Sequence, residues 1–437
     1  MDLHTAQALI RFGLGRRGEE PLPSDPVAWL QAQVEGEDTA VFAGLPTAAD
    51  GLTLLREQQR LILPPGTSLV GPVYQQDVRA QTELLLTTDA PFRERLVWFW
   101  ANHFTVSTRQ AQCSATVGPF VREAIRPYVT GPFFGMLIAV MQHPAMLMYL
   151  DNNVSVGPDS TVGRRQKRGL NENLARECLE LHTLGVDGGY TQADVTELAR
   201  VISGWSVDLE RLSPGFLFRP DTHEPGGKVL LDRRIPPGEA GGMAALELLA
   251  NHPATHRHLA TKLVRHFVAD APPPGAVAVI EGVLRDTGGD LGAAAIALLH
   301  LPEAWAPLGK VRSPQDYAVA VLRALNLPAE KLVVQGAPPV GPLSGVLTGL
   351  GQPVWAALLP NGWADDAAGW TGPEASMRRV DWAYSIAGRA GDRDAADVAE
   401  AALGPLLEAR TRDALHGAGS RRDALALLLS SPEFQRR

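Results

Sequence analysis

The sequence predicts an all-α fold: a bundle-like, multi-helix single large domain that carries one small β-hairpin insertion. Apolar side chains recur at helical spacing along most of the chain, which is the main signal for amphipathic helices. The composition, with 45% apolar and 20% charged residues in a chain of 437, is typical of a globular protein. No motif repeats at a fixed period, so a solenoid is not expected.

Helical periodicity first becomes clear at residues 26–34. Asp25 stands at the expected N-cap and Pro26 at the first helical position, where a residue without a backbone N–H is tolerated. The segment that follows Asp89 is the strongest helix, because it carries a dense run of apolar and aromatic side chains. The helices predicted in this part of the chain cover residues 52–63, 77–87, 91–104, 119–129 and 133–150.

A central helix is predicted over residues 171–184, after a loop at 151–168 that is rich in Asn, Gly and Ser. Gly185 follows this helix at the place of a left-handed C-cap. Thr191 and Asp194 then form a capping-box pattern, which predicts the start of the next helix.

Two histidines, His143 and His252, stand directly before prolines. The residue before a proline is biased away from the helical conformation. We therefore expect each histidine to mark the start of a helix.

One β element is predicted, a hairpin of residues 215–218 and 228–231 around the turn-rich segment 221–227. Helical periodicity resumes after this hairpin and continues to the end of the chain. The helices predicted there cover residues 241–251, 254–268, 275–286, 290–300, 315–324, 374–390, 394–411 and 421–430.

A weak domain boundary is predicted near residue 327. The stretch 327–373 is rich in Gly, Pro and Trp and interrupts the helical pattern. We expect a main helical domain at residues 1–326, which contains the central helix. Residues 327–437 are expected to form a loop region and helices that pack on that domain.

Charge and composition exclude several classes of protein. The net charge is −8, so the basic face that nucleic-acid phosphates require is not expected. Two cysteines, Cys113 and Cys178, cannot build a disulfide framework. No basic and then apolar leader opens the sequence, and no window holds about 18 uninterrupted apolar residues. We expect no membrane span and a cytoplasmic protein, with export alongside a partner as the alternative.

The central helix carries a stripe of polar side chains. Asn173, Glu177 and Glu180 follow the spacing i, i+4, i+7, which places them on one helical face. The two carboxylates can converge on one site, as metal ligands or general bases, and Arg176 can contact an anion. We therefore predict these four residues as catalytic. The alternative is a solvated face on which Arg176 pairs with Glu172 or Glu180.

Two histidines are candidate metal ligands. His182 falls on the apolar face of the central helix, roughly 160° from Glu180. His103 lies in an aromatic helix end at residues 98–104. If both meet in the fold, they could bind a divalent metal or haem, with Glu177 and Glu180 as further metal ligands. The alternative is a pair of hydrogen-bonded core histidines.

A basic segment precedes the central helix. Arg164, Arg165, Lys167 and Arg168 lie close to the expected helix N-terminus, and this combination predicts an anion or cofactor site. The alternative is a solvated basic loop. The sequence contains no P-loop, no Gly-x-Ser-x-Gly elbow, no His-Glu-x-x-His and no Cys-x-x-Cys motif.

The whole set of motifs resembles a bacterial family, the domain of unknown function 1800, over nearly the full length of the chain. The central helix with the residues around it, 169–205, is the most specific part. The other matching segments are Arg11-Phe12-Gly13 with Gly15, Phe99-Trp100 with Asn102-His103-Phe104, His143 to Leu147, Tyr149 to Asn152, His223 with Gly226 and Lys228, His252 to Thr255, Lys262-Leu263 and Gly362-Trp363.

The resemblance implies little about activity, because the family is named for its unknown function. Its members are often encoded beside a second family, the domain of unknown function 1501, whose members frequently look exported. The resemblance thus implies a protein partner from that family. Cys178 stands where the family usually has leucine, which is a small apolar exchange.

We expect an enzyme with a polar, metal- or haem-dependent site inside the helical bundle, and a redox or hydrolytic reaction. The expected pocket residues are Asn102, His103, Asn173, Arg176, Glu177, Glu180 and His182. One alternative is a non-enzymatic partner or scaffold for the associated exported protein. The other is a protein that binds an anionic small molecule or glycan at residues 164–168.

Overall fold

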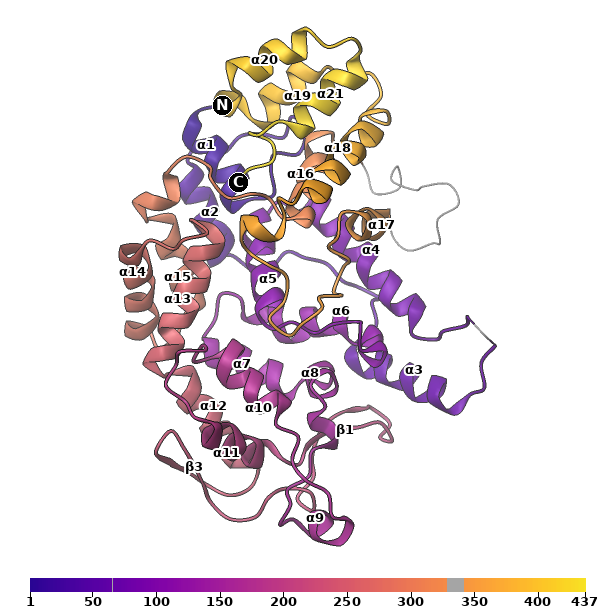
Figure 1. Cartoon of the computed structure of the whole chain (residues 1–437), viewed down its shortest axis with the longest axis vertical. Helices are drawn as coiled ribbons and strands as arrows, with labels where there is room; N and C mark the ends of the chain where they lie inside the picture. The colour runs from indigo at the N-terminus through magenta and orange to yellow at the C-terminus, as the bar shows by residue number, and fades with distance from the viewer. Residues whose placement is uncertain (65, 328–341) are drawn as a thin grey trace.

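The computed structural model describes residues 1–64, 66–327 and 342–437, and most of them are helical (Figure 1). This confirms the predicted all-α class. The first α-helices are α1 (Leu3–Gln7), α2 (Pro26–Glu35), α3 (Ala48–Arg60), α4 (Gly71–Thr87), α5 (Pro91–His103), α6 (Val117–Phe120), α7 (Phe133–Gln142), α8 (Pro144–Tyr149), α9 (Thr161–Gln166), α10 (Asn173–Glu177) and α11 (Gln192–Ile202). The later ones are α12 (Glu239–Ala250), α13 (Pro253–Phe267), α14 (Pro274–Asp286), α15 (Leu291–Leu299), α16 (Pro314–Ala324), α17 (Pro342–Gly349), α18 (Pro373–Ala387), α19 (Ala395–Ala402), α20 (Ala409–His416) and α21 (Arg421–Ser430).

Short helical turns of other types join these helices. The π-helical turns are η1 (Ala8–Phe12), η3 (Val121–Ile125) and η6 (Cys178–His182). The 3₁₀ turns are η2 (Ala111–Ala115), η4 (Arg126–Tyr128), η5 (Asn152–Val154), η7 (Pro302–Trp305), η9 (Ala367–Gly369) and η10 (Gly404–Leu406).

The strands form two small antiparallel hairpins: β1 (Trp205–Asp208) with β2 (Gly215–Phe218), and β3 (Lys228–Leu230) with β4 (Arg233–Ile235). The predicted strands at β2 and β3 exist, but the prediction that they pair with each other was wrong. Leu231 and Asp232 join β3 to β4 with φ values of 48° and 59°, as a two-residue hairpin turn requires. A leucine rarely adopts this conformation, so the sequence did not reveal the turn.

The local capping predictions are confirmed. Asp25 accepts hydrogen bonds from two backbone N–H groups at the start of α2. Thr191 and Asp194 form the complete capping box of α11. His143 and His252 are the N-caps of α8 and α13, and each accepts a backbone N–H through its ring. These signals were readable because a cap involves only residues within one helical turn.

The central helix consists of two parts. α10 ends at Glu177, and the chain continues as the π-helical turn η6. The prediction of one continuous α-helix over 171–184 was therefore wrong in its second half. Because a π-helix is wider than an α-helix, the side chains after Glu177 no longer follow 100° per residue. Gly185 has a φ of 86°, which confirms the left-handed position expected there.

The apolar core has two parts. One gathers residues of α2, α3, α5, α7, α8 and α10 through α15, with Trp100 and Trp205 among its largest buried side chains. The other gathers residues of α4 and α16 through α21, together with Ile10 and Leu14. The N-terminal segment therefore packs on the C-terminal helices. The predicted domain boundary at 326/327 stays a prediction, and residues 328–341, next to it, lie outside the described residues.

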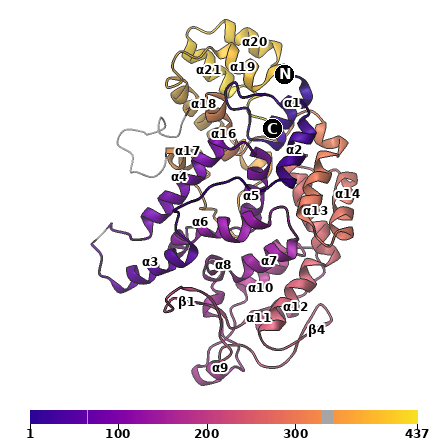
Figure 2. The same cartoon turned by 180° about the vertical axis from the view of Figure 1, so that it is seen from behind.

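The helices are arranged along one long axis. The C-terminal helices α18 to α21 gather at one end, and α9, α11 and the two hairpins lie at the other (Figure 1). The view from behind shows α5 and α16 between these ends (Figure 2). Among the described residues, no helix combines the length and the apolar content that a membrane crossing requires.

Candidate functional site

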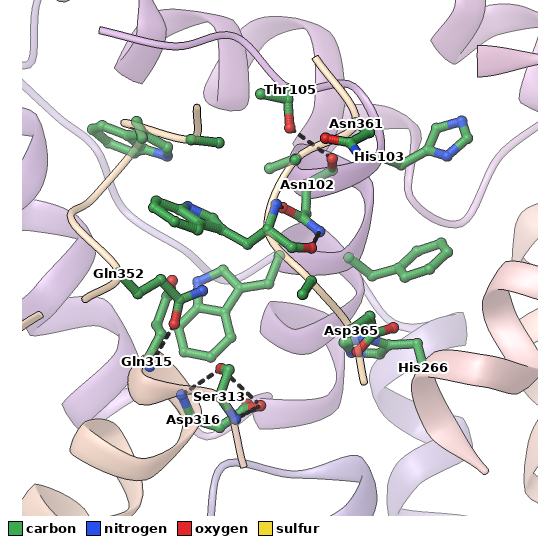
Figure 3. A pocket seen from close by; sticks show the side chains of 18 of the residues that line it. Asn102, His103, Thr105, His266, Ser313, Gln315, Asp316, Gln352, Asn361 and Asp365 are labelled. Atoms are coloured by element: carbon green, nitrogen blue, oxygen red, sulfur yellow. Dashed lines mark hydrogen bonds and ion pairs between the residues drawn. The ribbon is translucent and has the colours of Figure 1, made fainter. Parts of the chain in front are cut away.

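A pocket of about 510 Å³ lies between α5, α13, the start of α16 and the loop 352–366. Figure 3 shows Asn102 near its centre, Gln315 and Gln352 on one side, and His266 with Asp365 on another. The lining mixes carboxamide, charged and indole side chains. A concave site with a few converging polar groups is the usual form of a small-molecule site.

Asn102 fixes the loop that covers the pocket. Its Nδ2 donates to the carbonyl of Trp363 over 3.0 Å, and its Oδ1 accepts from the Trp363 N–H over 2.8 Å. Thr105 Oγ1 donates to the Asn102 carbonyl over 2.7 Å. Gly362, next to Trp363, has a φ of 78°, and a Cβ there would lie 2.5 Å from the Asn102 carbonyl oxygen. Only glycine therefore fits where the loop meets α5.

Replacing Gly362 with alanine is expected to lower the free energy of unfolding by about 1–3 kcal/mol, because the new methyl group requires both strain and displacement of Asn102. The loop 352–366 should also become more susceptible to limited proteolysis. Gly345→Ala is the matched control, since nothing lies within 4 Å of a Cβ added at that helical position. Equal melting temperatures and cleavage rates for both variants would contradict this account.

Buried and partly buried charged side chains form one side of the pocket. Asp316 accepts from Arg95 over 2.7 Å and lies 3.1 Å from the Arg437 guanidinium. Asp365 lies 3.2 Å from Arg437 and 2.9 Å from His266. The hydrogen bond from His266, with the charges of Arg437 and Lys310, holds the pKa of Asp365 near 2 against the opposing effect of burial. Arg95 and Arg437 hold the pKa of Asp316 far below its usual value. Both aspartates are therefore ionised across the physiological range.

His266 is held in one orientation. Its Nδ1 donates to Asp365, while its Nε2 is buried and has no hydrogen-bond partner within the described chain. Burial lowers the pKa of His266 to about 4, although Asp365 favours the charged ring. His266 is therefore a neutral imidazole at neutral pH, oriented by a carboxylate.

Three further imidazoles cluster beside the pocket. The ring centroid of His103 lies 6.2 Å from that of His182 and 6.1 Å from that of His258. His103 Nε2 donates to the His182 carbonyl, and His258 Nε2 donates to the Leu181 carbonyl. Burial, reinforced by the nearby Lys262, lowers the pKa of His182 to about 3 and of His258 to about 4. The pKa of His103 is also well below its usual value for the same reasons.

Lys262 is the cation that these histidines face. Its side chain lines the pocket and is partly exposed, and the described residues offer it no hydrogen bond or ion pair. Burial lowers the pKa of Lys262 to about 8; Asp365 opposes this shift and Arg265 adds to it. A lysine in this state exists partly as a free amine near neutral pH.

The structure brings together His103 and His182, and it separates them from the carboxylate stripe. Glu180 accepts from the Tyr190 hydroxyl over 3.3 Å, and neither Glu177 nor Glu180 lines the pocket. Burial and the neighbouring Glu180 raise the pKa of Glu177. No group of three or more His, Cys, Asp or Glu side chains in the described ranges is arranged to hold a metal ion. The metal and haem roles stay predictions.

The remainder of the predicted catalytic stripe belongs to a surface network. Arg176 lies 3.2 Å from Glu172 and donates to Gln192 over 3.0 Å. Glu172 also accepts from Thr196 over 2.7 Å, which joins α10 to α11. Asn173 is exposed. The alternative in which Arg176 pairs with Glu172 matches this geometry, while the catalytic roles of Asn173 and Arg176 stay predictions.

The basic segment lies at the far end of the molecule from the C-terminal helices, on α9 and just after it (Figure 1). Arg164, Arg165 and Arg168 are exposed and do not line the pocket. Arg164 lies 3.5 Å from Asp159, and Arg168 donates to the Val154 carbonyl. An anion or cofactor site at these residues stays a prediction.

Sequence reasoning named Asn102 and His103 but missed Lys262, His266 and Asp365. A signal for two of them was present on α13, where His258, Lys262 and His266 recur every four residues. This spacing places them on one face of the helix. No comparable local signal marks Asp365, because its loop has no periodicity.

Comparisons with known proteins place the chain in a family but do not indicate an activity. Neither a curated protein nor a solved structure matches it. One family model does match, over residues 7–436, and its description is "Protein of unknown function (DUF1800)". Because this match covers nearly the whole chain, the protein belongs to the DUF1800 family.

Proposed function

We propose that this protein is an enzyme and that the pocket between α5, α13 and the loop 352–366 is its active site. Lys262 takes a proton from, or gives one to, a small polar substrate held in that pocket. The observation that carries the proposal is the state of Lys262, an amine with no hydrogen-bond partner in the described chain, at the wall of a pocket that combines polar and apolar side chains.

The electrostatic surroundings suit proton transfer at Lys262. An acid or base works best when its pKa lies near the working pH, and burial brings the pKa of Lys262 to about 8. The neighbouring imidazoles of His103 and His258 stay neutral, so they do not compete for the same proton near pH 7. Asp365 lies close enough to favour the charged amine, but it makes no ion pair with it.

The walls of the pocket suit a polar organic molecule. The carboxamides of Asn361 and Gln352 offer hydrogen-bond donors and acceptors, and Gln81 has a buried Oε1 without a partner among the described residues. Trp355 and Trp363 add flat apolar surface. A volume of about 510 Å³ lies within the usual range of small-molecule sites.

Burying a lysine also has a cost that argues for function. A pKa below the usual value means that folding disfavours the charged side chain. Lys262→Met removes this unfavourable term and keeps the length of the side chain. We therefore expect the variant to melt at the same temperature as the native protein, or higher.

The test is a proton-exchange assay in deuterium oxide. The protein is incubated with a pool of hydroxy acids, oxo acids, amino acids, sugars and sugar phosphates, and proton NMR follows every resonance. We expect the native protein to exchange a carbon-bound proton, or to convert one compound. Lys262→Met should lower the rate at least 100-fold while the fold is retained, a loss typical of removing a general acid or base.

Glu177→Gln and Glu180→Gln serve as matched controls, because both carboxylates lie outside the pocket. Full activity in both variants is expected. If they abolish turnover while Lys262→Met keeps it, the carboxylate stripe is the active site and the proposal is wrong. A pool that the native protein leaves unchanged also contradicts it.

A further inference from the structure

The chain contains five lysines, and their surroundings differ sharply. Lys228 is buried and donates to the Glu224 carbonyl, with His223 3.1 Å away. Lys310 is buried, pairs with Asp270 and donates to the Asp365 carbonyl over 2.8 Å. Lys167 is exposed on the surface. Among the four lysines in the described ranges, Lys262 is the one that faces a pocket without a bonded partner.

Contacts one helical turn before and one turn after Lys262 fix the backbone of α13 at this residue. His258, one turn earlier, donates to the Leu181 carbonyl over 3.0 Å. His266, one turn later, donates to Asp365 over 2.9 Å. Both anchors lie on the same face of α13 as Lys262. The backbone at Lys262 is therefore fixed, while its amine makes no hydrogen bond or ion pair with the described residues.

Charged and titratable groups from several elements face Lys262. They come from α13 itself, from α5, from the turn η6 and from the covering loop. Asp365 is the attractive group, Arg265 is the repulsive one, and the three clustered imidazoles are neutral. The residues that face Lys262 are thus His103, His182, His258, Arg265 and Asp365. No carboxylate among them pairs with the amine.

We propose that the Lys262 amine is a nucleophile, which forms an imine with a small polar aldehyde or ketone bound in this pocket. This inference rests on the proposed function and names its substrate class. The nitrogen attacks the carbonyl carbon, a C–N bond forms, and the C–O bonds break. The oxygen leaves as water with the two hydrogens of the neutral amine, so no other reactant is required.

The position of Lys262 favours this chemistry over simple anion binding. A lysine that serves as a phosphate or carboxylate contact must stay charged, whereas burial here favours the neutral amine. Arg265 is exposed and lines the same pocket, and a guanidinium is the usual partner of anionic groups, so it is the better contact for an anionic group on the substrate. The pocket thus offers both a nucleophile and a separate cation.

The test is reductive trapping with glyceraldehyde and cyanoborohydride at pH 7, followed by intact-mass measurement and peptide mapping. The free-amine fraction of Lys262 predicts labelling on the order of 100-fold faster than at an ordinary exposed lysine. Lys167, which is exposed, is the site to compare. At pH 10 this preference should fall to about 3- to 4-fold, because ordinary lysines then also carry free amine. Lys262→Arg keeps the charge and should abolish only the fast label.

The outcomes separate this inference from the proposed function. Fast labelling at Lys262 supports the nucleophile even if the metabolite pool is not turned over, in which case the proposed function alone fails. Turnover that depends on Lys262, with labelling no faster than at Lys167, overturns the imine and leaves proton transfer standing. A third outcome is that Lys262 is labelled no faster than Lys167 and that inorganic phosphate slows its labelling. That result identifies Lys262 as an anion contact and overturns the inference.

Discussion

Replacing Asp316 with asparagine is expected to lower the free energy of unfolding by about 3–5 kcal/mol, because it leaves buried cations without their counter-charge. Asp316 is almost fully buried and lies 2.7 Å from Arg95 and 3.1 Å from Arg437. Arg95 also donates to the Gly13 carbonyl, so it cannot turn away to solvent without breaking a second contact. Urea denaturation at pH 7 measures this loss.

An exposed ion pair provides the control. Asp392 lies 3.1 Å from Arg421, and its side chain is fully exposed. Asp392→Asn should leave the unfolding midpoint unchanged, since water replaces the lost contact. If both substitutions shift the midpoint equally, burial is not what makes the Asp316 pairs important. Asp316→Asn should also alter the pocket wall, because Asp316 lines it.

Acid is expected to destabilise the protein well above the pKa of its carboxylates. The rings of His182, His258 and His266 have pKa values of about 3, 4 and 4, and the pKa of His103 is also well below the usual value. An unfolded histidine has a pKa of about 6.5. Between these values the unfolded chain binds protons and the folded chain does not.

The sign follows from this difference in bound protons. A depressed histidine pKa gives stability that is present above pH 6.5 and is lost as the pH falls towards 4. Each proton bound on unfolding contributes about 1.4 kcal/mol per pH unit. The histidines named above should by themselves lower the free energy of unfolding by about 4–6 kcal/mol per pH unit near pH 5. Denaturation at pH 7, 6 and 5 measures this slope.

His182→Leu tests the origin of that slope. Both ring nitrogens of His182 are buried without a hydrogen-bond partner in the described structure, so an apolar side chain of similar size is tolerated there. At pH 7 the variant should be about as stable as the native protein. At pH 5 it should be more stable by about 2 kcal/mol, because one unfolded-state proton is lost. An unchanged slope would contradict the role given to the buried rings.

The contrast between α13 and the loop 352–366 shows how far local sequence patterns reach. The apolar spacing of α13 and the His252-Pro253 start predicted its course closely. The loop has no period and few capping signals, so its path depends on contacts such as the two bonds between Asn102 and Trp363, which are 261 positions apart. Such contacts leave no pattern in a single sequence.

Asp316 makes one contact that can be predicted from the sequence and one that cannot. Its capping box with Ser313 is readable from the sequence, because both partners lie in one turn of α16. Its pair with Arg95, 221 positions away, is not. The prediction of the central helix was wrong in its second half for a related reason. The π-helical turn η6 packs between α5 and α13, where its carbonyls accept from His103 and His258, and these contacts leave no pattern in its own residues.

The sequence by itself determined the all-α class, most helix starts and the membership of the DUF1800 family. These features depend on interactions within a few residues or on motifs that stand in the sequence. Only the tertiary structure decided that His103 and His182 lie side by side, that Glu177 and Glu180 lie elsewhere, and that Lys262 faces a pocket. Burial and charge at a site are set by neighbours far along the chain, and packing alone selects those neighbours.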